Sequence, residues 1–86
     1  MPQPRHRPGS SRQEGLTACL RDVNVARARL DAARHTGARR WEEHPLRAEL
    51  LAALELYAAA ITELGAPVPY RLTSEIELYR RLGDRG

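Results

Sequence analysis

The sequence contains neither phenylalanine nor lysine, and it has one tryptophan and one cysteine among its 86 residues. Because Cys19 is the only cysteine, an internal disulfide is excluded. With so few aromatic residues, a hydrophobic core has to be built from Leu, Ala, Val and Ile. A chain of this size forms one domain at most, and its folding buries only about 60–65% of the unfolded surface.

Long apolar runs are also missing. No stretch of about 18 apolar residues occurs, so we expect no membrane-spanning helix. The amino-terminal arginines are followed by no apolar segment of the kind found in secretory signals. These absences predict a cytoplasmic protein without membrane contact.

All 14 basic residues are arginine, and together with 11 acidic residues they give a net charge of +3. The planar guanidinium binds phosphate through two hydrogen bonds, so this usage is compatible with nucleic-acid binding. A genome rich in G and C produces the same bias, because Arg and Ala codons are rich in both bases. The modest net charge favours the second explanation.

Sequence signatures of catalysis are absent as well. The chain has no phosphate-binding glycine loop, no G-x-S-x-G and no dinucleotide-binding fingerprint. Its histidines, His6, His35 and His44, lack the spacing of a metal site. We therefore predict a non-enzymatic protein with no catalytic residue, no metal and no cofactor.

The clearest periodic signal lies in residues 46–64. Large apolar residues recur there at steps of three and four, which places them on one face of a helix: Leu46, Leu50, Leu54, Tyr57, Ile61 and Leu64. Pro45 suits a first helical position, and Gly65 suits the residue that closes a helix. We predict a helix at 45–64 with a turn at His44, because a residue before proline disfavours helix.

A first helix is predicted at 11–40, where Ser11 and Glu14 have the spacing of a capping box. Gly37 is an alternative end for it. Apolar and small residues alternate along it in a heptad pattern, as in a short coiled coil: Leu16, Cys19, Val23, Ala26, Leu30 and Ala33. The small residues let the bulky face of helix 45–64 approach closely. Because the connection between the two helices is short, we expect them to pair antiparallel.

A short third helix is predicted at 74–82, after an extended connector that contains Pro67 and Pro69. Its start is marked by the capping-box spacing of Ser74 and Glu77. Residues 1–10 are predicted to be a disordered basic tail, and residues 84–86 a frayed end. The predicted fold is all-α: one domain at 11–83, formed by a long antiparallel two-helix hairpin and the third helix.

The apolar arc of helix 45–64 is wider than one neighbouring helix can cover, which predicts self-association or docking on another protein. A homodimer that forms a four-helix bundle is the simplest closed arrangement. The leading hypothesis is therefore a protein–protein interaction module that serves as a small regulatory or accessory subunit. The predicted partner-binding residues are Trp41, Leu51, Leu56, Tyr70 and Tyr79.

The alternative hypothesis is a small nucleic-acid-associated regulator. Its contacts would come from the basic tail and from an arginine row on the first helix: Arg5, Arg7, Arg12, Arg21, Arg39 and Arg40. Such binding would weaken steeply as salt rises, because phosphate contacts release counterions.

Overall fold

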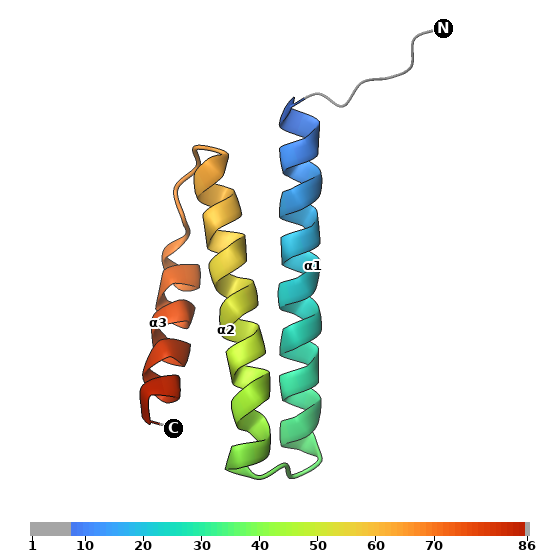
Figure 1. The fold of residues 1–86 in the computed structure, drawn as a ribbon, viewed down its shortest axis with the longest axis vertical. Coiled ribbons are helices and arrows are strands. Elements are labelled where there is room, and N and C mark those ends of the chain that lie inside the picture. Colours follow the sequence, from blue (N-terminus) through green and yellow to red (C-terminus); the bar gives the residue numbers. More distant parts are fainter. Residues whose placement is uncertain (1–7, 86) are drawn as a thin grey trace, which may run out of the picture.

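The computed structural model describes residues 8–85, with side chains from residue 13 to residue 83. Helix α1 spans Pro8–His35, α2 spans Arg40–Glu63 and α3 spans Tyr70–Arg85. The helices lie side by side in chain order, and each runs opposite to the one before it (Figure 1). The predicted all-α class is confirmed. Within the described residues, no helix has the length and apolar character needed to cross a bilayer.

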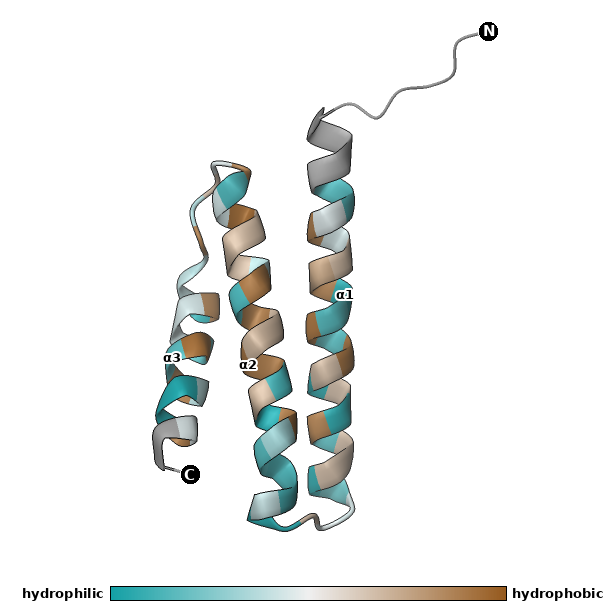
Figure 2. Ribbon diagram, in the orientation of Figure 1, coloured by the Kyte–Doolittle hydropathy of each residue, from teal (hydrophilic) through white to brown (hydrophobic). Residues whose placement is uncertain are grey.

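The hydrophobic core lies along the face of α2 that meets both of its neighbours. Leu50 and Leu54 are 1% and 0% exposed, and they join one cluster with buried residues of α1 and α3: Val23, Ala26, Leu30, Ile61, Leu72 and Ile76. Figure 2 shows the apolar residues gathered on the facing sides of the helices. Of the small α1 residues predicted to face α2, Ala26 belongs to the cluster, where it lies with the bulkier Val23 and Leu30.

Both long helices end on a glycine in the left-handed region, with φ of 78° at Gly37 and 80° at Gly65. At the end of α1, the Ala38 N–H donates to the Ala33 carbonyl at 2.9 Å, which is the outer bond of a Schellman motif. The same pattern of bonds closes α2. The predicted closing roles of both glycines are confirmed, and α1 ends before the turn rather than at Arg40.

The start of α1 differs from the prediction. The helix begins at Pro8 and not at Ser11, so the last residues of the predicted tail are helical. Proline suits a first helical position, because the N–H that it lacks would have no partner within the helix. The predicted cap at Ser11 is therefore wrong, and residues 1–7 lie outside the described residues.

Helix α2 begins at Arg40, five residues before the predicted start at Pro45. The Glu42 carboxylate accepts a hydrogen bond from the Arg39 N–H at 2.7 Å, which satisfies one free donor at the start of the helix. Pro45 lies on the exposed side of α2, where water can hydrate the carbonyl that its missing N–H leaves free. His44 is therefore helical, and the predicted turn there is wrong.

Helix α3 begins at Tyr70, four residues before the predicted cap at Ser74. The Pro69 carbonyl accepts hydrogen bonds from the N–H groups of Leu72 and Thr73, at 3.1 and 3.2 Å. A proline just before the helix loses no intrahelical bond, so the proline connector starts α3 earlier than the capping-box spacing suggested. The helix also continues past its predicted end, to the penultimate residue of the chain.

Exposed ion pairs link each helix to the others. Arg29 of α1 pairs with Glu49 of α2, and Arg80 of α3 pairs with Glu55 of α2 at 2.7 Å. A third pair joins α1 to α3 through Arg27 and Glu75. Because these groups are solvated, each pair contributes at most about 1 kcal/mol to stability. The core therefore holds the helices together, and the ion pairs favour their orientation.

Leu54 and Leu56 offer a direct comparison of a buried and an exposed leucine on α2. Leu54→Ala should lower the free energy of unfolding by about 2–5 kcal/mol, because it leaves a cavity in the core. Leu56 is 63% exposed, so Leu56→Ala should change the same quantity by less than about 1 kcal/mol. Urea unfolding followed by circular dichroism measures both. Equal losses would contradict the assigned core.

Gly15, inside α1, and Gly37, just after its end, should respond in opposite ways to alanine. Gly37→Ala should destabilise the fold by about 1–2 kcal/mol, because alanine is strained at a positive φ. Gly15 lies inside the helix with open space around it, so Gly15→Ala should stabilise the fold by about 0.5–1 kcal/mol. Thermal unfolding measures both effects. The melting temperature should fall for Gly37→Ala and rise for Gly15→Ala, and shifts of the same sign would contradict the two conformations.

Candidate functional site

The contact face of α2 changes from apolar to charged near the α1–α2 turn. Steps of three and four residues back from Leu50 lead to Arg47 and then to Glu43. Both side chains are largely buried, with 14% and 18% of their surface exposed. Figure 2 shows this end of α2 as mostly hydrophilic, so the packing between the helices becomes polar here.

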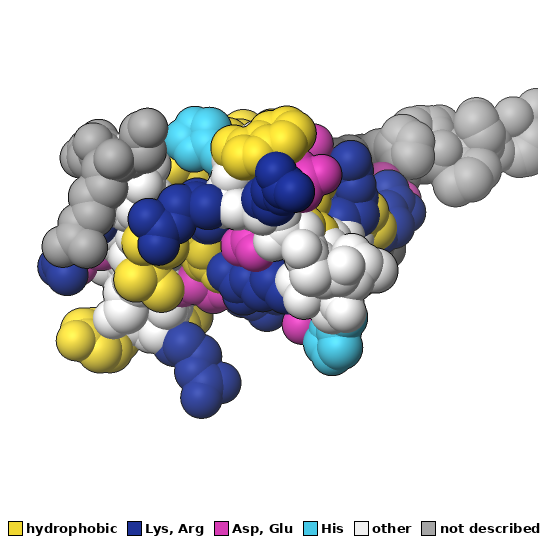
Figure 3. Space-filling model, turned by 90° about the horizontal axis from the view of Figure 1, so that it is seen from below, with side chains coloured by type: hydrophobic (Ala, Val, Ile, Leu, Met, Phe, Trp, Pro, Cys, Tyr) yellow, Lys and Arg dark blue, Asp and Glu magenta, His cyan; other side chains and the backbone are white. Residues whose placement is uncertain are grey.

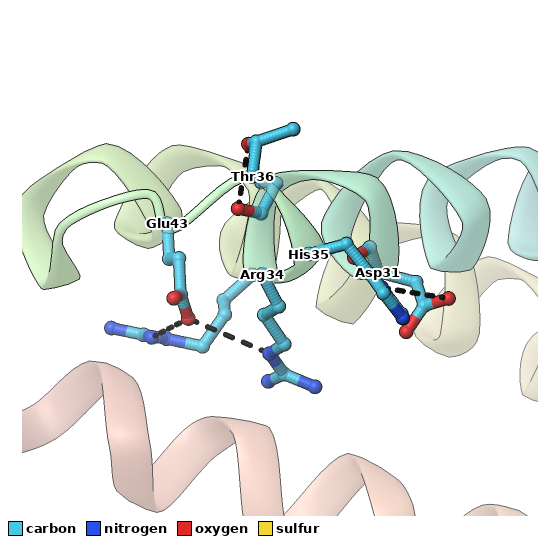
Figure 4. Close-up of polar contacts among 7 residues, drawn as sticks. Asp31, Arg34, His35, Thr36 and Glu43 are labelled. Atoms are coloured by element: carbon cyan, nitrogen blue, oxygen red, sulfur yellow. Dashed lines mark hydrogen bonds and ion pairs between the residues drawn. The ribbon is translucent and has the colours of Figure 1, made fainter.

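Glu43 is the acidic centre of this polar region. Its Oε1 accepts a hydrogen bond from Arg47 Nη1 at 3.3 Å and lies 3.5 Å from Nε of Arg34 on α1. Figure 4 shows the Glu43 carboxylate reaching across to the Arg34 side chain. Among the described residues, the buried Nε of Arg47 has no hydrogen-bond partner. An unpartnered buried donor costs about 1–3 kcal/mol, so this polar region is not optimised for stability alone.

An open hollow of about 830 Å³ surrounds the carboxylate and its two arginines. We call it the end pocket. It is lined by residues from all three helices: Arg34, Arg40, Trp41, Glu43, His44, Arg47 and Leu82. Four other hollows measure about 350–420 Å³. Figure 3 looks onto this end of the molecule and shows arginine side chains gathered beside exposed hydrophobic groups.

The lining of the end pocket is positively charged and partly aromatic. It carries three guanidinium groups and one carboxylate, which leaves a net charge of +2 when His44 is neutral. Trp41 lines the pocket and is 70% exposed. Such a surface attracts anions and offers a flat face for stacking. Among the described residues, no group of three His, Cys, Asp or Glu side chains is placed to hold a metal ion.

The predicted partner-binding residues do not form one surface. Trp41 lies at the start of α2 beside the α1–α2 turn, Leu56 lies in the second half of α2, and Tyr70 is the first residue of α3. These three are well exposed. Leu51 and Tyr79 are partly buried against the core, so they help to hold α2 and α3 together.

The arginines of the nucleic-acid hypothesis are also separated where the structure describes them. Arg39 and Arg40 lie at the turn and are exposed. Arg21 is exposed about 20 Å away along α1, given the rise of an α-helix. The side chains of Arg5, Arg7 and Arg12 lie outside the described part of the chain.

The sequence analysis missed the buried pair Glu43 and Arg47. A signal for it was available, because the spacing that joins Leu54 to Leu50 continues to these two positions. Charged residues on an otherwise apolar helical face are the kind of departure that marks a special site. The contribution of Arg34 and Leu82 could not be inferred in the same way, since it depends on how three helices converge.

The chain was compared with protein-family models, with curated proteins and with solved structures, and none of the three comparisons found a match.

Breaking the buried pair should cost more than breaking an exposed one. Glu43→Gln removes the carboxylate shared by Arg34 and Arg47, and we expect the free energy of unfolding to fall by about 1–3 kcal/mol. The matched change Glu49→Gln breaks the exposed pair with Arg29 and should cost less than about 1 kcal/mol. Urea unfolding at low salt gives both values, and a smaller loss for Glu43→Gln would refute the buried network.

Proposed function

We propose that the chain is a non-enzymatic protein interaction module that forms a homodimer and serves as a small regulatory or accessory subunit. The observation that carries this proposal is an exposed apolar strip between α1 and α2. Val25 and Leu56 are 52% and 63% exposed on the two sides of a shallow hollow. We call this strip the apolar face. Its lining is Arg21, Asp22, Val25, Ala26, Glu49, Ala52, Ala53 and Leu56.

The apolar face remains open because α3 covers a different side of α2. No lining residue of the face comes from α3. Helix α3 instead lies on the side of α2 where Glu55 pairs with Arg80. Of the residues predicted to bind a partner, Leu56 alone lies on this face. Burying two large aliphatic side chains against another apolar surface is favourable by about 25 cal/mol per Å² of area.

A second copy of the chain is the occupant that the charges favour. The chain as a whole has a net charge of +3, whereas this face carries Arg21 beside Asp22 and Glu49. A surface with both signs can pair with itself about a two-fold axis, because each arginine can meet an acidic residue of the other copy. The alanines between Val25 and Leu56 add little bulk, so helices of two copies can approach closely.

The nucleic-acid alternative gains no such support. Its exposed arginines are divided between the turn and the middle of α1, and phosphate binding along a duplex favours a continuous basic stripe. The interaction module therefore remains the proposal.

Leu56→Asp should abolish self-association and leave the helical fold intact, because the aspartate would place a charge in the proposed interface. Leu78→Asp is the matched control, since Leu78 is an exposed leucine of α3 outside the apolar face. We expect the dissociation constant of the dimer to rise by at least about tenfold for Leu56→Asp and to stay unchanged for Leu78→Asp. Sedimentation equilibrium measures this, with circular dichroism as the check on folding.

A wild-type chain that stays monomeric and folded at high micromolar concentration would refute the homodimer. Equal weakening by Leu56→Asp and Leu78→Asp would refute the apolar face as its site, because a general effect of added negative charge would then explain both results.

A further inference from the structure

We propose that the end pocket binds a small ligand that carries both a phosphate group and a planar ring, of the mononucleotide class. This inference does not rest on the proposed dimer. The end pocket and the apolar face share no lining residue, and only the end pocket includes α3.

The phosphate half of the ligand is indicated by the arginines. The net charge of the lining, +2 with neutral His44, matches the charge of about −1.5 to −2 on a phosphate monoester at neutral pH. Glu43 holds Arg34 through its Nε, so the terminal nitrogens of that guanidinium are not used in this contact. Arg40 is exposed at the same pocket and forms no ion pair with a described residue. Two guanidinium groups are therefore available to phosphate oxygens, which they bind in pairs of hydrogen bonds.

Arg47 supports the same assignment from inside the pocket wall. It is 14% exposed, and its Nε has no hydrogen-bond partner among the described residues. This nitrogen has almost no accessible surface, so it does not itself reach a ligand in the hollow, and Arg47 acts there through its charge. Its positive charge also adds to the attraction for an anion.

The planar half of the ligand is indicated by Trp41. Its ring lines the pocket while 70% of the residue remains exposed, so the ring can receive a flat ligand group by stacking. Leu82 of α3 supplies an apolar contact in the same pocket. The hollow, at about 830 Å³, lies within the range of about 300–1,000 Å³ that small-molecule sites occupy.

Trp41 also provides the measurement, because it is the only tryptophan in the chain. Adenosine monophosphate, adenosine and inorganic phosphate are each titrated into the full chain at low salt while tryptophan fluorescence is recorded. We expect saturable binding of adenosine monophosphate that is at least about tenfold tighter than that of either part alone. Failure to saturate at millimolar ligand, or equal binding of inorganic phosphate, would overturn the proposal.

Two arginine variants separate a specific site from general attraction. Arg40→Gln should weaken binding of adenosine monophosphate by about 10- to 100-fold, because it removes charge-assisted hydrogen bonds to the phosphate. Arg71→Gln removes another exposed charge, near the start of α3 and outside the pocket, and should leave binding unchanged. Equal effects of the two variants would overturn the proposal.

The dimer variant keeps this test distinct from that of the proposed function. Leu56→Asp should bind adenosine monophosphate as the wild type does, because Leu56 lies outside the end pocket. If association is lost and binding is retained, the two sites are independent. If binding is lost together with association, the end pocket as described here is refuted.

Discussion

The structure depends on one helix that is buried from two directions at once. Helix α2 packs against α1 and α3, which make their backbone contacts with α2 and not with each other. Leu50 and Leu54 are almost completely buried at this shared boundary. In so short a chain, the free energy of one such stripe is a large part of the total. The same geometry forces Arg47 and Glu43 into the helix contacts, because they continue the stripe toward the turn. The polar end of the molecule is thus a consequence of the apolar packing above it.

The sequence predicted features that are set locally or by periodicity. The apolar spacing of α2 and the left-handed glycines 37 and 65 are of this kind, since each follows from a few neighbouring residues. The helix starts were predicted less well. The capping-box spacings at Ser11 and Ser74 compete with prolines upstream, and a proline next to a helix start loses no hydrogen bond. The sequence predicts a helix boundary at Pro45, yet an exposed position inside α2 tolerates this proline.

The candidate site was predicted only in part, for a related reason. Trp41 could be selected from composition, because a lone exposed tryptophan near a turn is unusual in a chain otherwise poor in aromatics. The pocket beside Trp41 could not be predicted from the sequence. Its residues Arg34, Arg47 and Leu82 are distant along the chain and meet only when three helices converge. The apolar face shows the same limit. Leu51 and Leu56 look alike in the sequence, but in the packed helices the first is partly buried against the core and the second is 63% exposed.

The backbone of α3 packs against α2, and α3 reaches α1 through side chains such as the exposed Arg27–Glu75 ion pair, so α3 should open more easily than the α1–α2 hairpin. Local opening that releases α3 would expose Leu72 and Ile76 and break the exposed ion pairs at Glu55 and Glu75, while the packing of α1 on α2 could survive. Amide protons of α3 would then exchange with solvent sooner than those in the middle of α2. Because Leu82 forms one wall of the end pocket, each such opening would also remove that wall. A ligand that binds only the closed pocket would make this opening rarer, because binding stabilises the state in which α3 is packed.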